Sequence, residues 1–341
     1  MIGLIAVDGG NSKVDLALVA EDGSLLSAVR GPTISHQAAG GLRGAVVALQ
    51  GVVRAALAEA GLGAPERDPI ARVAVFAVAG ADTPADVRRL RRAFGRLNLA
   101  ERLIIVTDAY GALRAGTDDG VGAVVICGSG SNMLAIGPTG RVASYPALGE
   151  IAGDWGGGGS IGPAALSAAI RGRDGRGPRT SLERLVPRAL GLARPIDVTF
   201  ALYRGRLTGS DIRELAPLVF AAAGDGDAVA RFIVDQQADE IVAMAVAALR
   251  RVRALRSAVP VVLAGGVFRT TDPAFHERIR AGLATAAPRA QIRRLTVPPV
   301  VGAALLGLDA LGSPPAAADR LRASLVEDAI VRMSSGPGQQ P

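Results

Sequence analysis

The sequence predicts a two-domain α/β protein in which each domain holds a mixed sheet with helices on its faces. The chain has 341 residues, more than one domain of ~150 residues needs. A pattern of strand, glycine-containing loop, strand, turn and strand occurs at residues 2–30 and again at 121–144. Helix-linked strands follow the first pattern, and helices on both faces of a sheet are typical of such alternation.

Local signals divide the first half of the chain into short elements. Residues 21–24 form a hairpin turn, Gly61 ends a helix, and Thr83-Pro84 opens one with an N-cap and a proline at the first helical position. Strands are expected at 2–8, 14–20, 25–30, 72–78 and 103–106, and helices at 40–60, 84–97 and 108–115.

The second half contains long helical stretches. Strands are expected at 121–127, 133–136, 141–144, 259–264 and 291–295. Helices are expected at 160–171, 181–190, 195–203, 209–223, 226–254, 273–285, 299–311 and 315–329. Composition predicts a disordered tail over 334–341.

The charge pattern favours a solvated surface over a nucleic-acid partner. Lysine and arginine total 38, the formal net charge is +7, and Lys13 is the single lysine. The arginines lie in helix-like segments such as 88–92 and 250–253, without interleaved aromatic residues. We therefore expect no nucleic-acid partner.

The cysteine content and the hydropathy of the chain indicate in which cellular compartment the protein is expected. Cys127 is the one cysteine, so a single chain can form neither a disulfide nor a cysteine-ligated zinc or iron–sulfur site. A reducing cytoplasm fits this composition. The N-terminus lacks the basic start of a signal peptide, and no stretch of ~18 uncharged apolar residues is expected to span a membrane.

The first loop has the composition of a phosphate-binding turn. An apolar strand ends at Asp8, and small or polar residues follow before the next strand. Glycine lets backbone N–H groups approach an anion, and an aspartate at the strand end can hold Mg²⁺ through water. The predicted phosphate-binding residues of this loop are Gly9, Gly10, Asn11, Ser12 and Lys13.

A second loop, Gly128 to Ser131, repeats this chemistry after the strand that ends at Cys127. Either loop alone could be an ordinary turn between strands. The pair, with Gly265-Gly266 after a third strand, favours two phosphate-binding loops that serve one cleft.

Two further features leave alternatives open. Asp108 follows a strand and begins a helix, where it could act on a ligand or simply cap the helix. The run Gly156–Gly159 predicts either a mobile hinge or a backbone surface close to a ligand. Asp154 before it could accept hydrogen bonds from a ligand or serve as a turn residue.

The motifs taken together resemble the sugar kinase/Hsp70/actin superfamily. Residues 8–13, 127–132 and 263–267 resemble its two phosphate motifs and its adenosine motif, in the same order. Within the superfamily the chain resembles the BadF/BadG family, which includes N-acetylglucosamine kinases. Residues 106–109 resemble the segment with the catalytic aspartate, and 149–159 the glycine-rich sugar-binding stretch.

The resemblance implies a two-domain actin-like ATPase fold (ribonuclease H-like) with a cleft between the domains. The domains would span 1–117 with about 299–330, and 118–298. It implies ATP and Mg²⁺ as cofactors, and transfer of phosphate from ATP to an amino sugar, N-acetylglucosamine giving its 6-phosphate. It also allows a homodimer.

The resemblance assigns roles to single residues. Asp108 would be the general base and Asp8 would hold the metal, while Gly265 and Gly266 would contact adenosine. The residues implied for sugar binding are Ser35, His36, Gly80, Asp108, Gly149 and Asp154.

Departures from the family pattern fall on the sugar side. Trp155 stands where the family usually has glutamate, Leu148 near a frequent tryptophan, and Ser35 at a frequent asparagine. Glucosamine or another amino sugar is therefore an alternative substrate. A dehydratase-activator ATPase is disfavoured because it needs cluster cysteines. A non-catalytic sugar regulator could dispense with Asp108 or the loops, and this chain keeps both.

Overall fold

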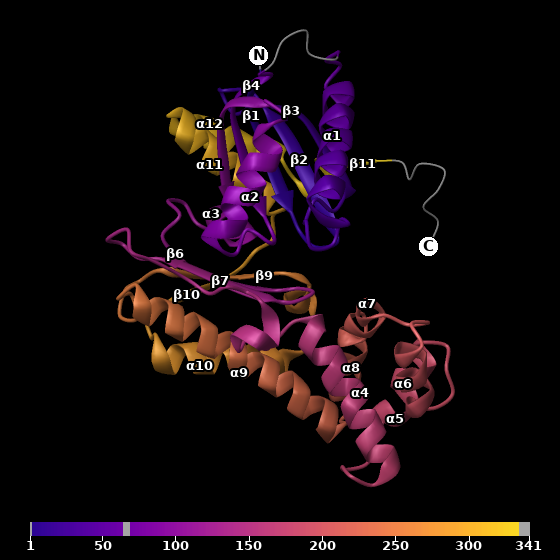
Figure 1. The fold of residues 1–341 in the computed structure, drawn as a ribbon. Helices are drawn as coiled ribbons and strands as arrows, with labels where there is room; N and C mark the ends of the chain where they lie inside the picture. Colours follow the sequence, from indigo (N-terminus) through magenta and orange to yellow (C-terminus); the bar gives the residue numbers. More distant parts are fainter. Residues whose placement is uncertain (1, 64–68, 334–341) are drawn as a thin grey trace. The chain divides into compact units, whose positions relative to one another are not determined.

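The computed structural model describes residues 2–63 and 69–333, and the chain divides into two compact units (Figure 1). Unit 1 comprises the residues up to Val121 and those from Leu295 onward, and unit 2 runs from Gly122 to Arg294. Residues 334–341, the predicted disordered tail, lie outside the described residues.

Unit 1 is built on a six-stranded sheet in the order β11-β3-β2-β1-β4-β5. Strands β1, β2 and β3 form an antiparallel meander, and β4 and β5 add parallel to β1. The strands are β1 Ile2–Gly9, β2 Lys13–Val19, β3 Leu25–Pro32, β4 Ala71–Val78, β5 Ala100–Val106 and β11 Val331–Arg332.

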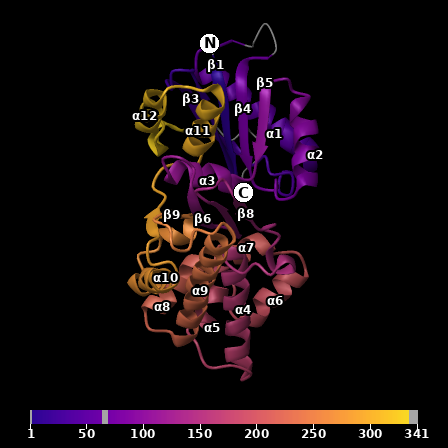
Figure 2. The same ribbon diagram turned by 90° about the vertical axis from the view of Figure 1, so that its left-hand side faces the viewer.

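Both faces of this sheet are covered, because successive side chains of a strand point to opposite faces. On β1, Ile5 and Val7 join a core with helices α1 (Gly41–Glu59) and α2 (Pro84–Gly95). Leu4 and Ala6 join the opposite core with α11 (Val300–Leu311) and α12 (Pro315–Ser324). Figure 2 shows the two helix pairs on opposite sides of the strands.

Unit 2 is built on a five-stranded sheet in the order β10-β9-β6-β7-β8. This is the order β5-β4-β1-β2-β3 of unit 1, without a counterpart of β11. Strands β6, β7 and β8 form the antiparallel meander, and β9 and β10 add parallel to β6. The strands are β6 Gly122–Cys127, β7 Ser131–Ile136, β8 Val142–Ser144, β9 Pro260–Ala264 and β10 Gln291–Arg294. The repeated pattern in the sequence therefore corresponds to a repeated sheet.

Helices cover one face of this sheet and extend unit 2 beyond it. Helix α9 lies along β6, β7 and β8 with α10 beside it (Figure 1), and α4 packs on α9 and the shorter helices. The helices are α4 Gly158–Asp174, α5 Leu182–Ala189, α6 Pro195–Tyr203, α7 Gly209–Arg213, α8 Ala216–Gly224, α9 Ala228–Arg251 and α10 Pro273–Ala286. The 3₁₀ segments are Gly149–Ala152, Gly266–Arg269 and, in unit 1, Glu327–Ala329.

Two helix predictions were wrong. The single helix expected over 209–223 is split into α7 and α8, because Pro217 has no N–H to donate to the carbonyl of Arg213 and its ring would clash there. The helix expected over 315–329 ends at Ser324. The chain beyond it pairs as β11 with the open edge of β3, which satisfies backbone groups that a helix would leave unpaired.

Helix α1 combines the length of a membrane span with the burial pattern of a core helix. By length and composition it is the one described helix apolar enough to cross a membrane. Its residues Ala45, Leu49, Val52 and Ala56 are fully buried, and they pack on the core of unit 1. This burial is what a core helix requires.

Helix α3 (Asp108–Gly116) is held against α11 at a point without side chains. A Cβ atom at Gly302 would overlap the carbonyl oxygen of Gly111. Beside this contact, Arg114 donates to both carboxylate oxygens of Asp309, at 2.8 and 3.1 Å. Because α3 begins at Asp108, these contacts position that carboxylate.

Gly302→Ala should destabilise the protein by about 1–3 kcal/mol, because the added methyl group forces α11 away from α3. Gly51→Ala is the matched control, since a Cβ there meets no atom within 4 Å and the residue lies inside α1. It should stabilise by about 0.5–1 kcal/mol. Urea unfolding measures the free energy of unfolding of both variants. Equal changes in the two variants would contradict the close contact of Gly302 with Gly111.

Candidate functional site

The loop between β1 and β2 is closed by its own backbone and by a neighbouring segment. The N–H of Gly10 donates to the carbonyl of Lys13 at 3.0 Å. Thr33 donates its hydroxyl to the carbonyl of Gly10 at 2.6 Å, and Ser35 donates to Oδ1 of Asn11 at 2.9 Å. Within the described residues, the N–H groups of Asn11 and Ser12 donate to no other group. The loop thus has a fixed shape and two N–H groups available to an anion.

Tight packing explains the glycine at position 9. A Cβ there would lie 2.9 Å from Cγ1 of Val78 and 3.0 Å from Cγ1 of Ile34. At Gly10 the nearest atom would be the Lys13 carbonyl oxygen at 3.5 Å, an ordinary contact. The sequence predicted that Gly9 allows an anion to approach the backbone. The structure gives a second reason for glycine at this position, because the side chains of Val78 and Ile34 pack against it.

A row of charged residues crosses the sheet behind this loop. Asp8 on β1 pairs in register with Asp15 on β2, which pairs with Arg30 on β3. Arg30 donates to both carboxylate oxygens of Asp15, at 2.6 and 2.7 Å, and also to Glu327 at 2.5 Å. The charge of Asp15, which is fully buried, is therefore matched by a two-pronged ion pair.

Within residues 2–63 and 69–333 no arginine or lysine forms such an ion pair with Asp8, and the pKa of Asp8 shows the consequence. Burial raises the pKa of Asp8 well above its ordinary value, and the negative charges of Asp108 and Asp15 raise it further. Lys13 and Arg30 lower it by less. The strand end therefore concentrates more negative charge than the described protein groups neutralise, which a bound cation would relieve.

Asp108 lies close enough to Asp8 for their charges to interact. It is the first residue of α3 and is partly buried, and Thr107 donates its hydroxyl to Oδ1 of Asp108 at 3.1 Å. Thr107, not Asp108, occupies the N-cap position. The helix-capping alternative for Asp108 is therefore wrong.

Lys13 begins β2 with its side chain 45% exposed. Its Nζ atom lies 3.8 Å from Oδ2 of Asp15, whose oxygens already accept from Arg30. The ammonium group is thus only loosely held and can extend toward a ligand beside the loop.

His36 and Gly80 are brought together by the fold of unit 1. A Cβ at Gly80, whose φ is +85°, would lie 3.0 Å from the His36 ring. Nδ1 of His36 is buried without a hydrogen-bond partner within the described chain. Ser35, in contrast, is buried and uses its hydroxyl proton on Asn11.

The loop between β6 and β7 in unit 2 occupies the position that 9–13 occupies in unit 1. The N–H of Gly128 donates to the carbonyl of Gly130 at 2.9 Å and closes the turn. In the described part of the chain, the N–H groups of Ser129 and Gly130 donate to nothing else. A Cβ at Gly128 or Gly130 would meet no protein atom within 4 Å, so both stretches of backbone are open to a ligand. Ser131 follows, partly buried, as the first residue of β7.

Neither alternative for the four-glycine run was correct. The N–H of Gly156 donates to the hydroxyl of Ser160 at 2.9 Å, and that of Gly157 to Oε1 of Gln237 at 2.7 Å. Gly158 and Gly159 donate to carbonyl oxygens of the loop 128–131, at 2.8 and 2.7 Å. All four N–H groups are therefore committed within the protein, which leaves neither a hinge nor a ligand surface.

Asp154 comes just before this run. Its Oδ2 atom is buried without a hydrogen-bond partner among the described residues, while its N–H donates to the carbonyl of Gly149 at 3.1 Å. A buried carboxylate oxygen without a donor is costly, so a ligand with hydroxyl groups would stabilise it. Gly149 is exposed, with φ of +71°.

Gly265 and Gly266 follow directly after β9 and lie in different environments. A Cβ at Gly265 would overlap the backbone of Cys127, and its φ is +105°. At Gly266 a Cβ would meet nothing within 4 Å. Contact with β6 thus explains Gly265, whereas Gly266 is open to a ligand.

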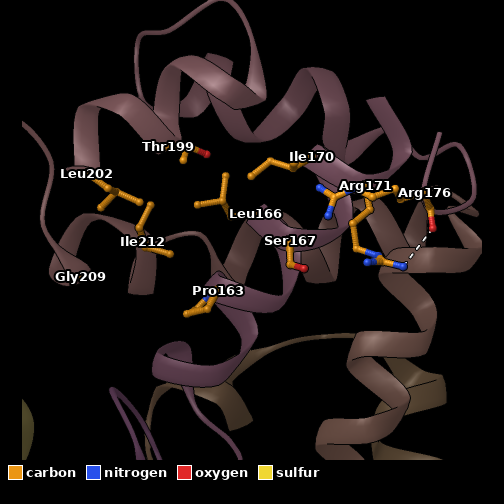
Figure 3. Close-up of a pocket in the computed structure, with 10 residues that line it drawn as sticks. All are labelled: Pro163, Leu166, Ser167, Ile170, Arg171, Arg176, Thr199, Leu202, Gly209 and Ile212. Atoms are coloured by element: carbon orange, nitrogen blue, oxygen red, sulfur yellow. Dashed lines mark hydrogen bonds between the residues drawn. The ribbon is translucent and has the colours of Figure 1, made fainter. Parts of the chain in front are cut away.

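A cavity of about 510 Å³ lies in the helical part of unit 2 (Figure 3). Leu166 and Ile170 form part of its apolar wall, the Thr199 hydroxyl is buried without a partner in the described chain, and Arg171 donates to the carbonyl of Arg176 at one end. The other lining residues are Pro163, Ser167, Leu202, Gly209 and Ile212. None of the predicted site residues lines it, so it is not the candidate site.

Sequence reasoning missed the residues that hold the loops in place. Thr33 and Ser160 are small hydroxyl residues without a distinctive sequence signal. Gln237 had a signal: it falls at helical spacing between the buried residues Val234 and Ile241 of α9.

The sequence as a whole was compared with known proteins. The profile of the BadF/BadG/BcrA/BcrD ATPase family matches residues 5–307. This chain belongs to that family. An N-acetylmuramic acid/N-acetylglucosamine kinase from Clostridium acetobutylicum is 29% identical over 275 residues, which cover 80% of this BadF/BadG-family chain and 88% of the relative.

Solved structures of similar fold were also found. A Chromobacterium violaceum protein provisionally named an N-acetylglucosamine kinase has a TM-score of 0.70 and 25% identity, covering 90% of this chain and 99% of that one. A ROK hexokinase from Thermus thermophilus has a TM-score of 0.53 and 19% identity, covering 91% and 99%. The actin-like ATPase fold expected for this BadF/BadG-family member is confirmed.

Asp8→Asn should stabilise the protein increasingly as the pH rises above the ordinary carboxyl pKa of 3.8. Because the pKa of Asp8 is raised in the folded state, the folded chain holds this proton to higher pH than the unfolded chain does, and the contribution of Asp8 to stability falls with rising pH. Near pH 3.5 the two proteins should match, and at pH 7 the variant should melt more than about 2 °C higher.

Thermal unfolding between pH 3.5 and 8 measures this difference. Asp319→Asn, the same substitution at an exposed residue of α12, is measured alongside as the matched control. A pH-independent difference for Asp8→Asn would contradict the raised pKa.

Proposed function

We propose that this protein is an ATP-dependent amino-sugar kinase that phosphorylates N-acetylglucosamine at its 6-hydroxyl. The names of the Clostridium acetobutylicum and Chromobacterium violaceum relatives support the class of substrate. The observation that carries the proposal is the interaction of two aspartates, Asp8 and Asp108, beside a loop with free N–H groups.

Asp108 is the general base of the proposed reaction. A carboxylate at the first position of a helix can accept the proton of the sugar hydroxyl as that oxygen attacks the γ-phosphorus of ATP. The α3–α11 contacts keep this carboxylate in place, so positioning contributes to the rate.

Asp8 is the proposed residue for Mg²⁺. The uncompensated negative charge at the end of β1 fits a hard cation with oxygen ligands. Within the described residues no group of three His, Cys, Asp or Glu side chains could hold a metal, and Mg²⁺ in kinases needs only one or two carboxylates besides phosphate oxygens. When bound, Mg²⁺ supplies charge neutralisation on the phosphates.

Both glycine-containing loops are phosphate-binding loops in this proposal. The free N–H groups of Asn11 and Ser12, and of Ser129 and Gly130, donate to phosphate oxygens, and Lys13 adds a positive charge. Gly9, Gly10, Gly128 and Ser131 shape these loops, and Gly265 and Gly266 let the adenosine approach the backbone.

Two buried polar atoms, each without a hydrogen-bond partner among the described residues, support contacts with sugar hydroxyl groups. Oδ2 of Asp154 accepts from sugar hydroxyls, and Nδ1 of His36 offers a second polar contact. Gly80 holds the His36 ring, Ser35 holds the first loop, and Gly149 accepts from the Asp154 N–H. Ser35 therefore acts on the sugar side mainly by fixing the loop.

The environment of Cys127 disfavours a dehydratase-activator ATPase. The thiol is buried, and burial raises its pKa to about 12. A thiol that holds its proton so firmly is a poor cluster ligand, since metals bind the thiolate. This supports the kinase, acting in the reducing cytoplasm expected from the composition.

A sugar panel tests the proposal. With Mg-ATP, N-acetylglucosamine should give the highest kcat/KM in an ADP-release assay, with the 6-phosphate as product by NMR. The panel includes glucosamine, N-acetylmannosamine, glucose and N-acetylmuramic acid, which the Clostridium acetobutylicum enzyme's name includes. A higher kcat/KM for glucosamine would replace N-acetylglucosamine as the proposed substrate. Absence of turnover with every sugar would reject the proposed kinase activity.

Asp108→Asn should lower kcat by at least about 100-fold and leave ATP binding unchanged, since loss of a general base typically costs 10²–10⁴-fold. Turnover and calorimetric ATP binding measure the two effects, with Asp319→Asn as the matched control on the surface. A variant with near wild-type turnover would refute Asp108 as the base.

A further inference from the structure

The side chain of Gln237 is completely buried in unit 2, on the face of α9 that meets the sheet. Its Oε1 accepts a hydrogen bond from the N–H of Gly157 at 2.7 Å. Its Nε2 donates to Sγ of Cys127, the last residue of β6, at 3.7 Å. One amide thus joins three segments that are far apart in the sequence.

Gly157 directly precedes the two residues of α4 that donate hydrogen bonds to the loop 128–131. It is the N-cap of α4, with φ of +68°. The next two N–H groups donate to the carbonyl oxygens of Gly128 and Ser129, at 2.8 and 2.7 Å. The place of Gly157 therefore sets the backbone of the loop proposed to bind phosphate.

The glycine run cannot hold this position through side chains of its own. A Cβ at Gly157 would lie 2.7 Å from the carbonyl oxygen of Gly128, too close for any side chain. At Gly156 a Cβ would lie 3.0 Å from Nε2 of Gln237 and 3.4 Å from Cβ of Ser131. Gln237 thus fills the space against the run from the other side and supplies the acceptor that the run requires.

We propose that Gln237 is a positioning residue for the kinase reaction. Through Gly157 it fixes the loop 128–131 for phosphate binding, and it fixes the chain three residues after Asp154 for sugar binding. This inference rests on the proposed function for its effect on turnover, while the effect on the loop stands on the contacts alone.

The chemistry of the residue at 237 matters more than its volume. Methionine has a similar shape but no strong acceptor, so it leaves the Gly157 N–H buried without a partner. Glutamate keeps an oxygen acceptor at the same distance from the backbone. The two substitutions therefore separate loss of the hydrogen bond from a change of packing.

The test compares Gln237→Met with Gln236→Met, the same substitution one residue earlier, where no hydrogen bond of the side chain is found within the described residues. We expect kcat/KM for Mg-ATP to fall at least tenfold in Gln237→Met and less than twofold in Gln236→Met. Gln237→Glu should recover part of the loss. Hydrogen–deuterium exchange should accelerate over 128–131 and 156–160 in Gln237→Met, with β9 and unit 1 unchanged.

The outcomes distinguish this inference from the proposed function. If the wild type phosphorylates no sugar, the kinase is rejected, and the exchange data alone decide whether Gln237 holds the loop. Unchanged exchange at 128–131, or faster exchange throughout unit 2 including β9, would overturn the positioning role. Normal kcat/KM despite a loosened loop, or Gln237→Glu as impaired as Gln237→Met, would also overturn it.

Discussion

Backbone lies directly against backbone where β6 ends, and the arrangement of unit 2 depends on this contact. Carbonyl oxygens of Gly128 and Ser129 accept from the first N–H groups of α4, while Gly265 packs on the backbone of Cys127. Glycine is required because any side chain would separate these segments. The carbonyl groups of the loop thereby accept hydrogen bonds within the protein, whereas the N–H groups of Ser129 and Gly130 donate to no group in the described part of the chain.

Two neighbouring aspartates of unit 1, Asp15 and Asp8, have different roles. The buried Asp15 is matched by Arg30, which also binds Glu327, so this group stabilises the sheet. Asp8, one strand away, has no such ion pair among the described residues, and its raised pKa is a cost to folding at neutral pH. Such a cost is retained where a ligand needs the charge, and the neighbouring Asp108 supports that interpretation.

Much of the fold was predictable because its signals are local. Alternating apolar residues, the Thr83-Pro84 helix start and the repeated strand–loop–strand pattern each involve neighbours in the chain. The candidate site was predictable only as a set of motifs. The coupling of Asp8 to Asp108, the buried Oδ2 of Asp154 and the partner of Gly157 require contacts between distant segments.

The sequence by itself determined the two sheets, the two loops at corresponding strand ends and membership of a family of ATPases. Only the tertiary structure decided the use of the glycines at 156–159, because their N–H partners lie as far away as Gln237. It likewise replaced the end of the last predicted helix with β11. The physical reason is the same in both cases: a buried backbone N–H needs an acceptor, and the fold decides which one is near.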